Sequence, residues 1–227
     1  MNIVDFHTHI IPKADHGSSS IETSLFQVNE ALANGVSRII ATPHFYPTSH
    51  KMETFLQRRN EGYLQLREAL GDSPVQIKLG AEVLFCDSIE ELPNLEKLFI
   101  EGTNSLLLEL PFSTFAESYT DSVYALKKRG VDVILAHADR YPTEHIEKLV
   151  EYGARLQLNA DSLVGFFKRK SLYKWLERGL VIALGSDIHG NDRTAYQCFT
   201  KASMKIDHYL PYIKRESDKI FDKATFI

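Results

Sequence analysis

The chain opens with Ile3-Val4-Asp5-Phe6-His7-Thr8-His9, a short apolar run that passes directly into two histidines. The apolar run predicts a buried strand over residues 2–6. Successive side chains of a strand point to opposite faces, so two residues separated by one lie on the same face. His7 and His9 can therefore reach one ion, and neutral imidazole binds zinc, iron and manganese. The opening stretch predicts a strand that ends in a metal-binding pair.

The same pattern recurs along the chain. Six further apolar segments predict buried strands, over residues 36–42, 75–81, 105–110, 131–136, 155–159 and 181–185. Helical patterns alternate with them, over residues 21–34, 51–70, 88–99, 116–129, 143–152, 168–178, 192–204 and 209–221. Strands that alternate with helices are typical of a parallel sheet or barrel.

Residues that bind divalent metals lie at the carboxyl ends of nearly all these strands. They are His7, His9, His44, Glu82, Glu109, His137, Asp187 and His189, with Asp15 and His16 near the first strand. A parallel barrel gathers the carboxyl ends of its strands on one face. An open doubly wound sheet would instead distribute these residues along its edge. We therefore predict an α/β fold, a distorted TIM-like (β/α)7 barrel, with residues 1–227 forming a single domain.

The candidate ligands mix imidazoles with carboxylates, and their number exceeds what one four-coordinate zinc ion needs. Carboxylates favour harder ions such as manganese or magnesium. Glu109 lies inside the apolar run of residues 106–110, where an unpaired carboxylate would be costly. Asp187 and His189 repeat the one-residue spacing of the first pair. Two or three divalent ions bridged by carboxylates account for this set.

The composition fits a globular enzyme. The chain has 227 residues, of which 44% are hydrophobic, and a formal net charge of -4, which gives no sign of nucleic-acid binding or membrane insertion. No apolar stretch approaches the roughly 20 residues of a membrane span. Cys86 and Cys198 form no CxxC pair, and we expect reduced thiols in a cytoplasmic protein.

Five motifs, taken in order, resemble those of the polymerase-and-histidinol-phosphatase (PHP) metal hydrolases. Within that superfamily the chain most resembles the bacterial protein-tyrosine phosphatases of capsule and exopolysaccharide loci, from its first residues to about residue 200. The motifs are Asp5-Phe6-His7-Thr8-His9 with Asp15-His16-Gly17, Ala41-Thr42-Pro43-His44, Leu108-Glu109-Leu110-Pro111-Phe112, Ala136-His137-Ala138-Asp139-Arg140-Tyr141 and Ser186-Asp187-Ile188-His189.

The resemblance implies three ions, often manganese, with iron or zinc as alternatives. The first ion would be held by His7, His9, Glu82 and Asp187. Glu82 would bridge to a second ion, completed by Glu109 and His137. The third would be held by His44, His189 and His16. Tyrosine phosphatases of this group usually have Asp at the position of His16, whereas histidinol-phosphate phosphatases resemble this chain in having His there.

We expect hydrolysis of a phosphomonoester by hydroxide generated at the metal, because a bound ion lowers the pKa of water to about 7. Neither cysteine lies in a Cys-x5-Arg loop, since the positions where such loops carry arginine are Leu92 and Met204. The sequence therefore argues against the thiol-dependent phosphatases. Arg140 follows His137 by three residues and suits bidentate phosphate binding. The resemblance assigns the same role to a second arginine, for which Arg193 is the candidate.

The resemblance also implies a partner, a phosphotyrosine protein and in particular a bacterial tyrosine kinase. A phenolic leaving group with a pKa of about 10 needs little help from a general acid, which favours an aryl phosphate. Aromatic residues expected in loops over the ligand-bearing face could stack on a tyrosyl ring; they are Tyr46, Phe112, Phe115, Tyr119 and Phe166-Phe167. The alternatives are a histidinol-phosphate phosphatase and a non-catalytic, metal-stabilised PHP module.

Overall fold

A single sheet of parallel strands forms the centre of the molecule. The computed structural model describes residues 3–112, 115–165 and 170–223. In this part of the chain nine strands pair in the order β3-β5-β6-β7-β8-β9-β1-β2-β4. Their bounds are β1 Val4–Thr8, β2 Arg38–Ala41, β3 His44–Phe45, β4 Gln76–Leu79, β5 Glu82–Leu84, β6 Ser105–Glu109, β7 Asp132–Leu135, β8 Arg155–Asn159 and β9 Val181–Gly185.

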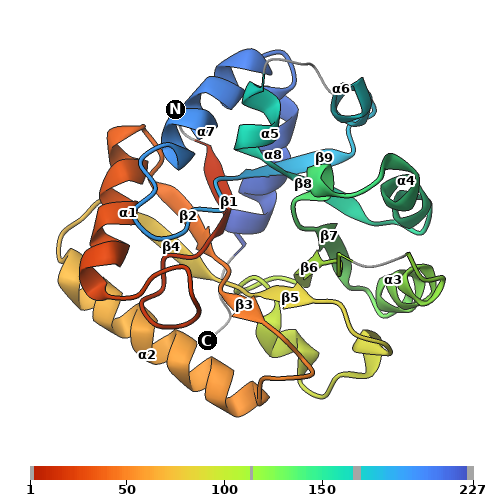
Figure 1. Ribbon diagram of the computed structural model, residues 1–227, viewed down its shortest axis with the longest axis horizontal. Coiled ribbons are helices and arrows are strands. Elements are labelled where there is room, and N and C mark those ends of the chain that lie inside the picture. The colour runs from red at the N-terminus through yellow and green to blue at the C-terminus, as the bar shows by residue number, and fades with distance from the viewer. Residues whose placement is uncertain (1–2, 113–114, 166–169, 224–227) are drawn as a thin grey trace.

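Helices surround this sheet, with α1 and α2 on one side and α3 and α4 on the opposite side (Figure 1). Ser20 caps the first of them by accepting a hydrogen bond from the backbone N–H of Thr23. The bounds are α1 Ile21–Ala33, α2 Met52–Leu70, α3 Ser118–Lys128, α4 Thr143–Glu151, α5 Ala160–Val164, α6 Lys170–Glu177, α7 Ala195–Lys205 and α8 Leu210–Phe221, with 3-10 helices η1 Ile89–Glu91, η2 Leu95–Leu98 and η3 Ala138–Arg140.

Two broken strands bring the edges of the sheet together. β2 and β3 are separated only by residues 42–43, yet β2 lies near one end of the strand order and β3 forms the other end. The short link from β4 to β5 connects the same two ends. The sheet therefore curls until its edges are neighbours, which confirms the predicted distorted barrel. The predicted strands 36–42 and 75–81 are present as β2 and β4, but the prediction missed β3 and β5, each of which begins after a break of two residues.

The inside of the curled sheet is filled by apolar side chains from several strands. Phe6, Ile40, Leu107 and Ile134 belong to one buried cluster with Phe221 of α8. Arg38, the first residue of β2, pairs with Asp218 of α8 and with Asp222, which directly follows that helix. α8 thus closes the amino end of the sheet and leaves the carboxyl ends of the strands as the accessible face of the barrel.

Other differences from the predicted elements are local. Residues 88–99 form the separate 3-10 helices η1 and η2 rather than one helix, because Pro93 between them cannot donate a backbone hydrogen bond. β1 extends to Thr8, so His7 lies within the strand, and the short helix α5 was not predicted. Phe166 and Phe167 lie outside the described residues. None of the described helices combines the length and apolarity that a membrane crossing requires.

Candidate metal centre

Glu82 lies where the carboxyl ends of the strands converge. Its side chain is fully buried, and both of its oxygens face imidazole nitrogens. Oε2 lies 3.1 Å from Nε2 of His7, 3.4 Å from Nε2 of His9 and 2.8 Å from Nδ1 of His44. Oε1 lies 2.8 Å from Nε2 of His137. One carboxylate therefore connects histidines carried by β1, β3 and the turn after β7.

Two further carboxylates complete the centre on opposite sides of Glu82. Asp187 Oδ1 lies 3.4 Å from Nε2 of His9 and 3.7 Å from Nε2 of His7. Glu109 Oε1 lies 3.5 Å from Nε2 of His137. The sequence placed all these residues at strand ends, and the structure brings them into one site.

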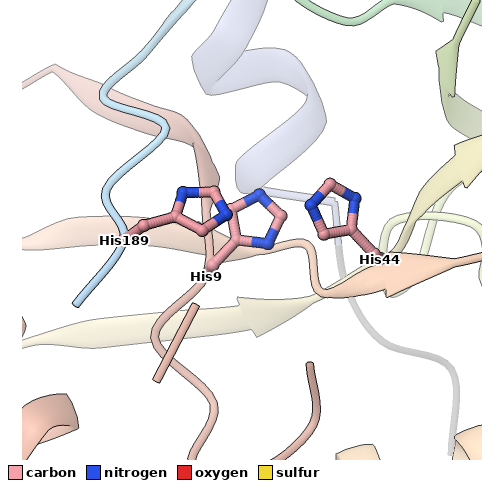
Figure 2. Close-up of side chains that lie close together, drawn as sticks. All are labelled: His9, His44 and His189. Carbon is pink, nitrogen blue, oxygen red and sulfur yellow. The ribbon is translucent and has the colours of Figure 1, made fainter. Parts of the chain in front are cut away.

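Three groups of side chains could each hold a metal ion, and they share members. The first, His7, His9 and Glu82, matches three of the four residues expected for the first ion. The others differ from the expected sets: His44 joins Glu82 and Glu109, and His9 joins His44 and His189. Figure 2 shows the three rings of this last group side by side, arriving from different segments of the chain.

His16 lies at the exposed rim of the site. Its ring centroid is 4.9 Å from that of His44 and 4.8 Å from that of His189. In the described part of the chain its nitrogens are not included in any of the three groups. The structure thus places His16 beside the third group, and its role as a ligand stays a prediction.

Hydrogen bonds set the tautomers of the first two histidines. Nδ1 of His9 donates to Oδ2 of Asp15 at 2.6 Å, and Nδ1 of His7 donates to Oε1 of Gln157 at 3.1 Å. Both rings therefore present Nε2 to the centre, where these two atoms are 3.1 Å apart. Two nitrogen lone pairs cannot face each other at that distance unless a proton or a cation lies between them. Asp15, expected as a candidate near the site, orients the ring of His9 and does not belong to any of the three groups found in the described residues.

The separations between donor atoms fit a divalent cation. Ligands about 2.1 Å from one ion lie about 3.0–3.4 Å from each other. Most of the distances around Glu82 Oε2 fall near this range. Glu82 Oε2 and His44 Nδ1 are buried and close, yet neither makes a hydrogen bond. Buried polar atoms without partners are costly, and a cation would satisfy both.

Carboxylates and histidines within the site stabilise each other's charged forms. Burial disfavours the charged form of Glu82, but the charge of His7 and the hydrogen bond from His137 hold the pKa of Glu82 well below its usual range. Burial also opposes a proton on His137, yet Glu109 and Glu82 raise the pKa of His137 to about 9. Without a cation, protons on histidines thus balance the carboxylates, and metal binding displaces these protons.

The backbone is strained at two of the candidate ligands. His137 has φ of 30° and Asp187 has φ of 52°, in the left-handed region that side chains rarely adopt. Such conformations persist only where surrounding contacts hold them, and they cluster at functional sites.

The two arginines expected to bind phosphate occupy different places. Arg140 lines the pocket over the metal centre together with His137 and Asp187, and its guanidinium donates to Asp187 Oδ2. Arg193 is exposed, and its guanidinium carbon lies 5.9 Å from the ring centroid of Phe26 on α1. The structure therefore brings Arg140 to the site and leaves Arg193 outside the pocket, so a phosphate contact by Arg193 stays a prediction.

A family model described as capsular polysaccharide synthesis, CpsB/CapC, matches residues 3–214. The chain belongs to this family. It is similar to the tyrosine-protein phosphatase YwqE of Bacillus subtilis (strain 168), with 28% identity over 197 residues, 82% of this chain and 77% of YwqE. It is 26% identical to the tyrosine-protein phosphatase CpsB of Streptococcus pneumoniae over 207 residues, 84% of each chain.

A solved structure shares the CpsB/CapC fold seen here. It is described as coming from crystal structures of YwqE from Bacillus subtilis and CpsB from Streptococcus pneumoniae, metal-dependent tyrosine phosphatases. The match has a TM-score of 0.79 and 23% identity, and it covers 99% of this chain and 96% of the other. The curled parallel sheet is therefore the fold expected of a CpsB/CapC chain.

Two site residues of this CpsB/CapC chain were missed by sequence reasoning. Gln157 and Asn159 are buried on β8, the strand to which no ligand was assigned. Gln157 Oε1 accepts from the backbone N–H of His137 at 2.6 Å, and Gln157 Nε2 donates to Asn159 Oδ1 at 3.0 Å. Asn159 Nδ2 donates to Asp187 Oδ2 at 3.0 Å. The signal was present in the alternation Leu-Gln-Leu-Asn, because amides on one face of a buried strand need partners.

Replacing Gln157 by Met should weaken metal binding. The change removes the acceptor that orients the His7 ring and the partner of the His137 backbone, and loss of such supporting contacts costs about 10–100-fold in metal affinity. Titration calorimetry with Mn²⁺ measures the effect. Gln76→Met on the exposed face of β4 is the matched control. An unchanged Mn²⁺ affinity in a folded Gln157→Met protein would contradict this positioning role.

Proposed function

We propose that this chain is a metal-dependent protein-tyrosine phosphatase that hydrolyses phosphotyrosine on a protein substrate. The observation that supports it most is the convergence of buried imidazoles and carboxylates on Glu82, with polar atoms left unpaired. The relatives named tyrosine-protein phosphatases point to the same reaction. The histidinol-phosphate alternative rests on His16 alone, which lies at the rim of the site.

The residues of the chain have separable tasks in this reaction. Bound divalent ions would activate water at neutral pH and neutralise charge on the phosphoryl oxygens. The ions would be held by three overlapping groups, which are His7, His9 and Glu82; His44, Glu82 and Glu109; and His9, His44 and His189, with Asp187 and His137 beside them. Arg140 would orient the phosphate, since its planar guanidinium can donate two parallel hydrogen bonds to phosphoryl oxygens.

We further propose manganese as the resident metal, in two or three sites, because the donors combine several carboxylates with imidazoles. The physiological substrate would be a bacterial tyrosine kinase whose dephosphorylation regulates capsule or exopolysaccharide synthesis. Residues 1–227 would act as one metallophosphatase domain. Cys86 and Cys198 are both free thiols, which suits the reducing cytoplasm.

Removing the metal should abolish turnover, and restoring manganese should recover it. Saturating Mn²⁺ should also raise the Tm of the stripped protein by about 5–10 °C, because a ligand that binds only the folded state stabilises it. The measurements are kcat/KM for a phosphotyrosine peptide and for histidinol phosphate after addition of Mn²⁺, Zn²⁺ or Fe²⁺. Preference for histidinol phosphate would replace the proposed substrate, and Mn²⁺ binding without turnover of either ester would favour the non-catalytic module.

Replacing Arg140 by Ala should lower kcat/KM for phosphate esters about 100-fold, the usual cost of one lost charge-stabilising donor. Arg140 contributes no ligand atom to the three groups, so manganese content should stay unchanged. Steady-state kinetics and elemental analysis of the same sample measure both. Arg178→Ala, which removes a half-exposed arginine paired with Glu147, is the control. Kinetics equal to the unmodified protein would remove Arg140 from phosphate binding.

A further inference from the structure

An aromatic cavity of about 200 Å³ adjoins the metal centre. It lies between the segment that follows β6 and the segment that follows β7, on the side of the molecule where Figure 1 shows α3 and α4. Its lining includes Leu110, Phe112, Phe115, Tyr119 and Tyr141. We call this cavity the aryl pocket.

Arg140 forms a common wall of the aryl pocket and the metal pocket, because its side chain lines both. The two cavities are also linked through the chain, since Leu110 directly follows Glu109 and Tyr141 directly follows Arg140. The ring centroid of Tyr141 lies 5.8 Å from that of His137. A molecule held by Arg140 at its phosphate would therefore have the aryl pocket immediately beside it.

The walls of the aryl pocket suit a flat apolar group. Phe112 and Tyr141 are stacked with centroids 5.5 Å apart, and Phe115 is stacked on His145 at 4.7 Å. The Tyr141 hydroxyl donates to the carbonyl of Leu110 at 2.7 Å, so the ring is held in place. Among the described residues, no Asp or Glu lines this cavity.

Phe112 is exposed to solvent although its ring stacks on that of Tyr141. Its side chain is 73% exposed, more than any other exposed large hydrophobic residue of the described chain. A contiguous apolar patch marks a binding groove more reliably than a single exposed residue does, and Phe112 is continuous with the apolar lining of the aryl pocket. Aromatic rings bind other rings through offset or edge contacts, with a preference beyond simple burial.

We propose that the aryl pocket binds the aromatic ring of the phosphate ester and thereby selects aryl over alkyl phosphates. In phosphotyrosine a single oxygen joins phosphorus to the ring, so a bound phosphate places the ring directly against the wall of the metal pocket. Alkyl phosphates such as phosphoserine carry no ring to fill the cavity. The inference rests on the proposed phosphatase function, since it assigns the leaving group of that reaction.

Phe112→Ala tests the proposal, because the exposed side chain can be removed without disturbing the core. In manganese-loaded protein, kcat/KM for free phosphotyrosine and phenyl phosphate should fall about tenfold, while that for phosphoserine stays unchanged. Met204→Ala, which removes an equally apolar side chain that is 66% exposed on α7, should alter neither.

Binding of two phosphonates separates the aryl pocket from the proposed activity, since neither compound is hydrolysed. By calorimetry, phenylphosphonate should bind the unmodified protein more tightly than methylphosphonate, and Phe112→Ala should remove most of that difference. If the protein prefers phenylphosphonate but hydrolyses no phosphotyrosine, the assignment of the aryl pocket stands and the proposed function is rejected. Equal losses on aryl and alkyl esters, or a loss confined to phosphopeptides, would overturn the ring assignment.

Discussion

Glu82→Gln should leave a folded protein that no longer retains manganese and has lost turnover by about 1,000-fold or more. Glu82 is the carboxylate whose two oxygens face four histidines, so the amide removes a charge from the middle of the centre. The amide nitrogen is a donor and cannot bind a cation. Loss of a buried central ligand therefore acts on more than one metal group at once.

The same substitution should lower the Tm of the metal-free protein but leave it folded. The low pKa of Glu82 means that the fold stabilises its charged form, and the neutral amide leaves the protonated histidines without that charge. Glutamine has nearly the same shape as glutamate, and its amide can donate to an imidazole nitrogen of the site. We therefore expect a lower Tm without metal and no rise in Tm on adding Mn²⁺. The missing Mn²⁺ effect in a folded protein separates a lost ligand from a lost fold.

Elemental analysis and thermal unfolding with and without Mn²⁺ check this result. Glu144→Gln, on the exposed surface of α4, is the matched control and should keep both metal and activity. Full manganese content in Glu82→Gln would show that the centre forms without this carboxylate, and the arrangement proposed here would fail.

Gly17→Ala should destabilise the protein by about 3 kcal/mol, which corresponds to a fall in Tm of about 5–10 °C. A Cβ atom at this position would lie 2.1 Å from Cβ of His9 and 2.9 Å from its carbonyl oxygen. Both contacts involve atoms fixed to the backbone, so rotation of a side chain cannot relieve them. The loop itself would have to move.

Hydrogen bonds hold that loop on several sides. The N–H of Gly17 donates to Asp15 Oδ1 at 2.8 Å, and its carbonyl accepts from Gln27 Nε2 at 3.0 Å and from the N–H of Gly190 at 2.6 Å. A displaced loop would carry Asp15 away from His9, whose orientation depends on it. Metal affinity should therefore fall together with stability.

Gly165→Ala provides the control, because a Cβ atom there meets nothing within 4 Å and its φ of -50° suits any residue. Differential scanning calorimetry and Mn²⁺ titration of the two variants give the comparison. A Gly17→Ala protein with the Tm and Mn²⁺ affinity of the unmodified chain would disprove the close packing between this loop and β1.

The candidate site was predictable because its chemistry repeats in the sequence. His7, Glu109 and Asp187 all occur at the ends of apolar runs, and parallel strands end on a common face. That rule needs neither exact strand bounds nor the pairing order. It therefore identified the convergent residues even though strands 36–42 and 75–81 were assigned without their breaks.

The supporting residues were not predictable by this rule. Gln157 lies in the middle of a strand, and Asp15 was expected near a metal rather than as the acceptor of the His9 ring proton. The role of a polar side chain depends on which histidine ring it contacts. These contacts join residues as far apart in sequence as His7 and Gln157, and a local sequence pattern carries no information about them.

The amino-acid sequence by itself determined the fold class and the residues that can bind metal, because apolar periodicity and ligand chemistry are properties of short segments. Only the tertiary structure decided which donors face each other, that β8 supports the centre through amides, and that Arg140 but not Arg193 reaches the pocket. The physical reason is closure of the curled sheet. The short links from β2 to β3 and from β4 to β5 bring its two edges together, and this closure sets every distance within the site.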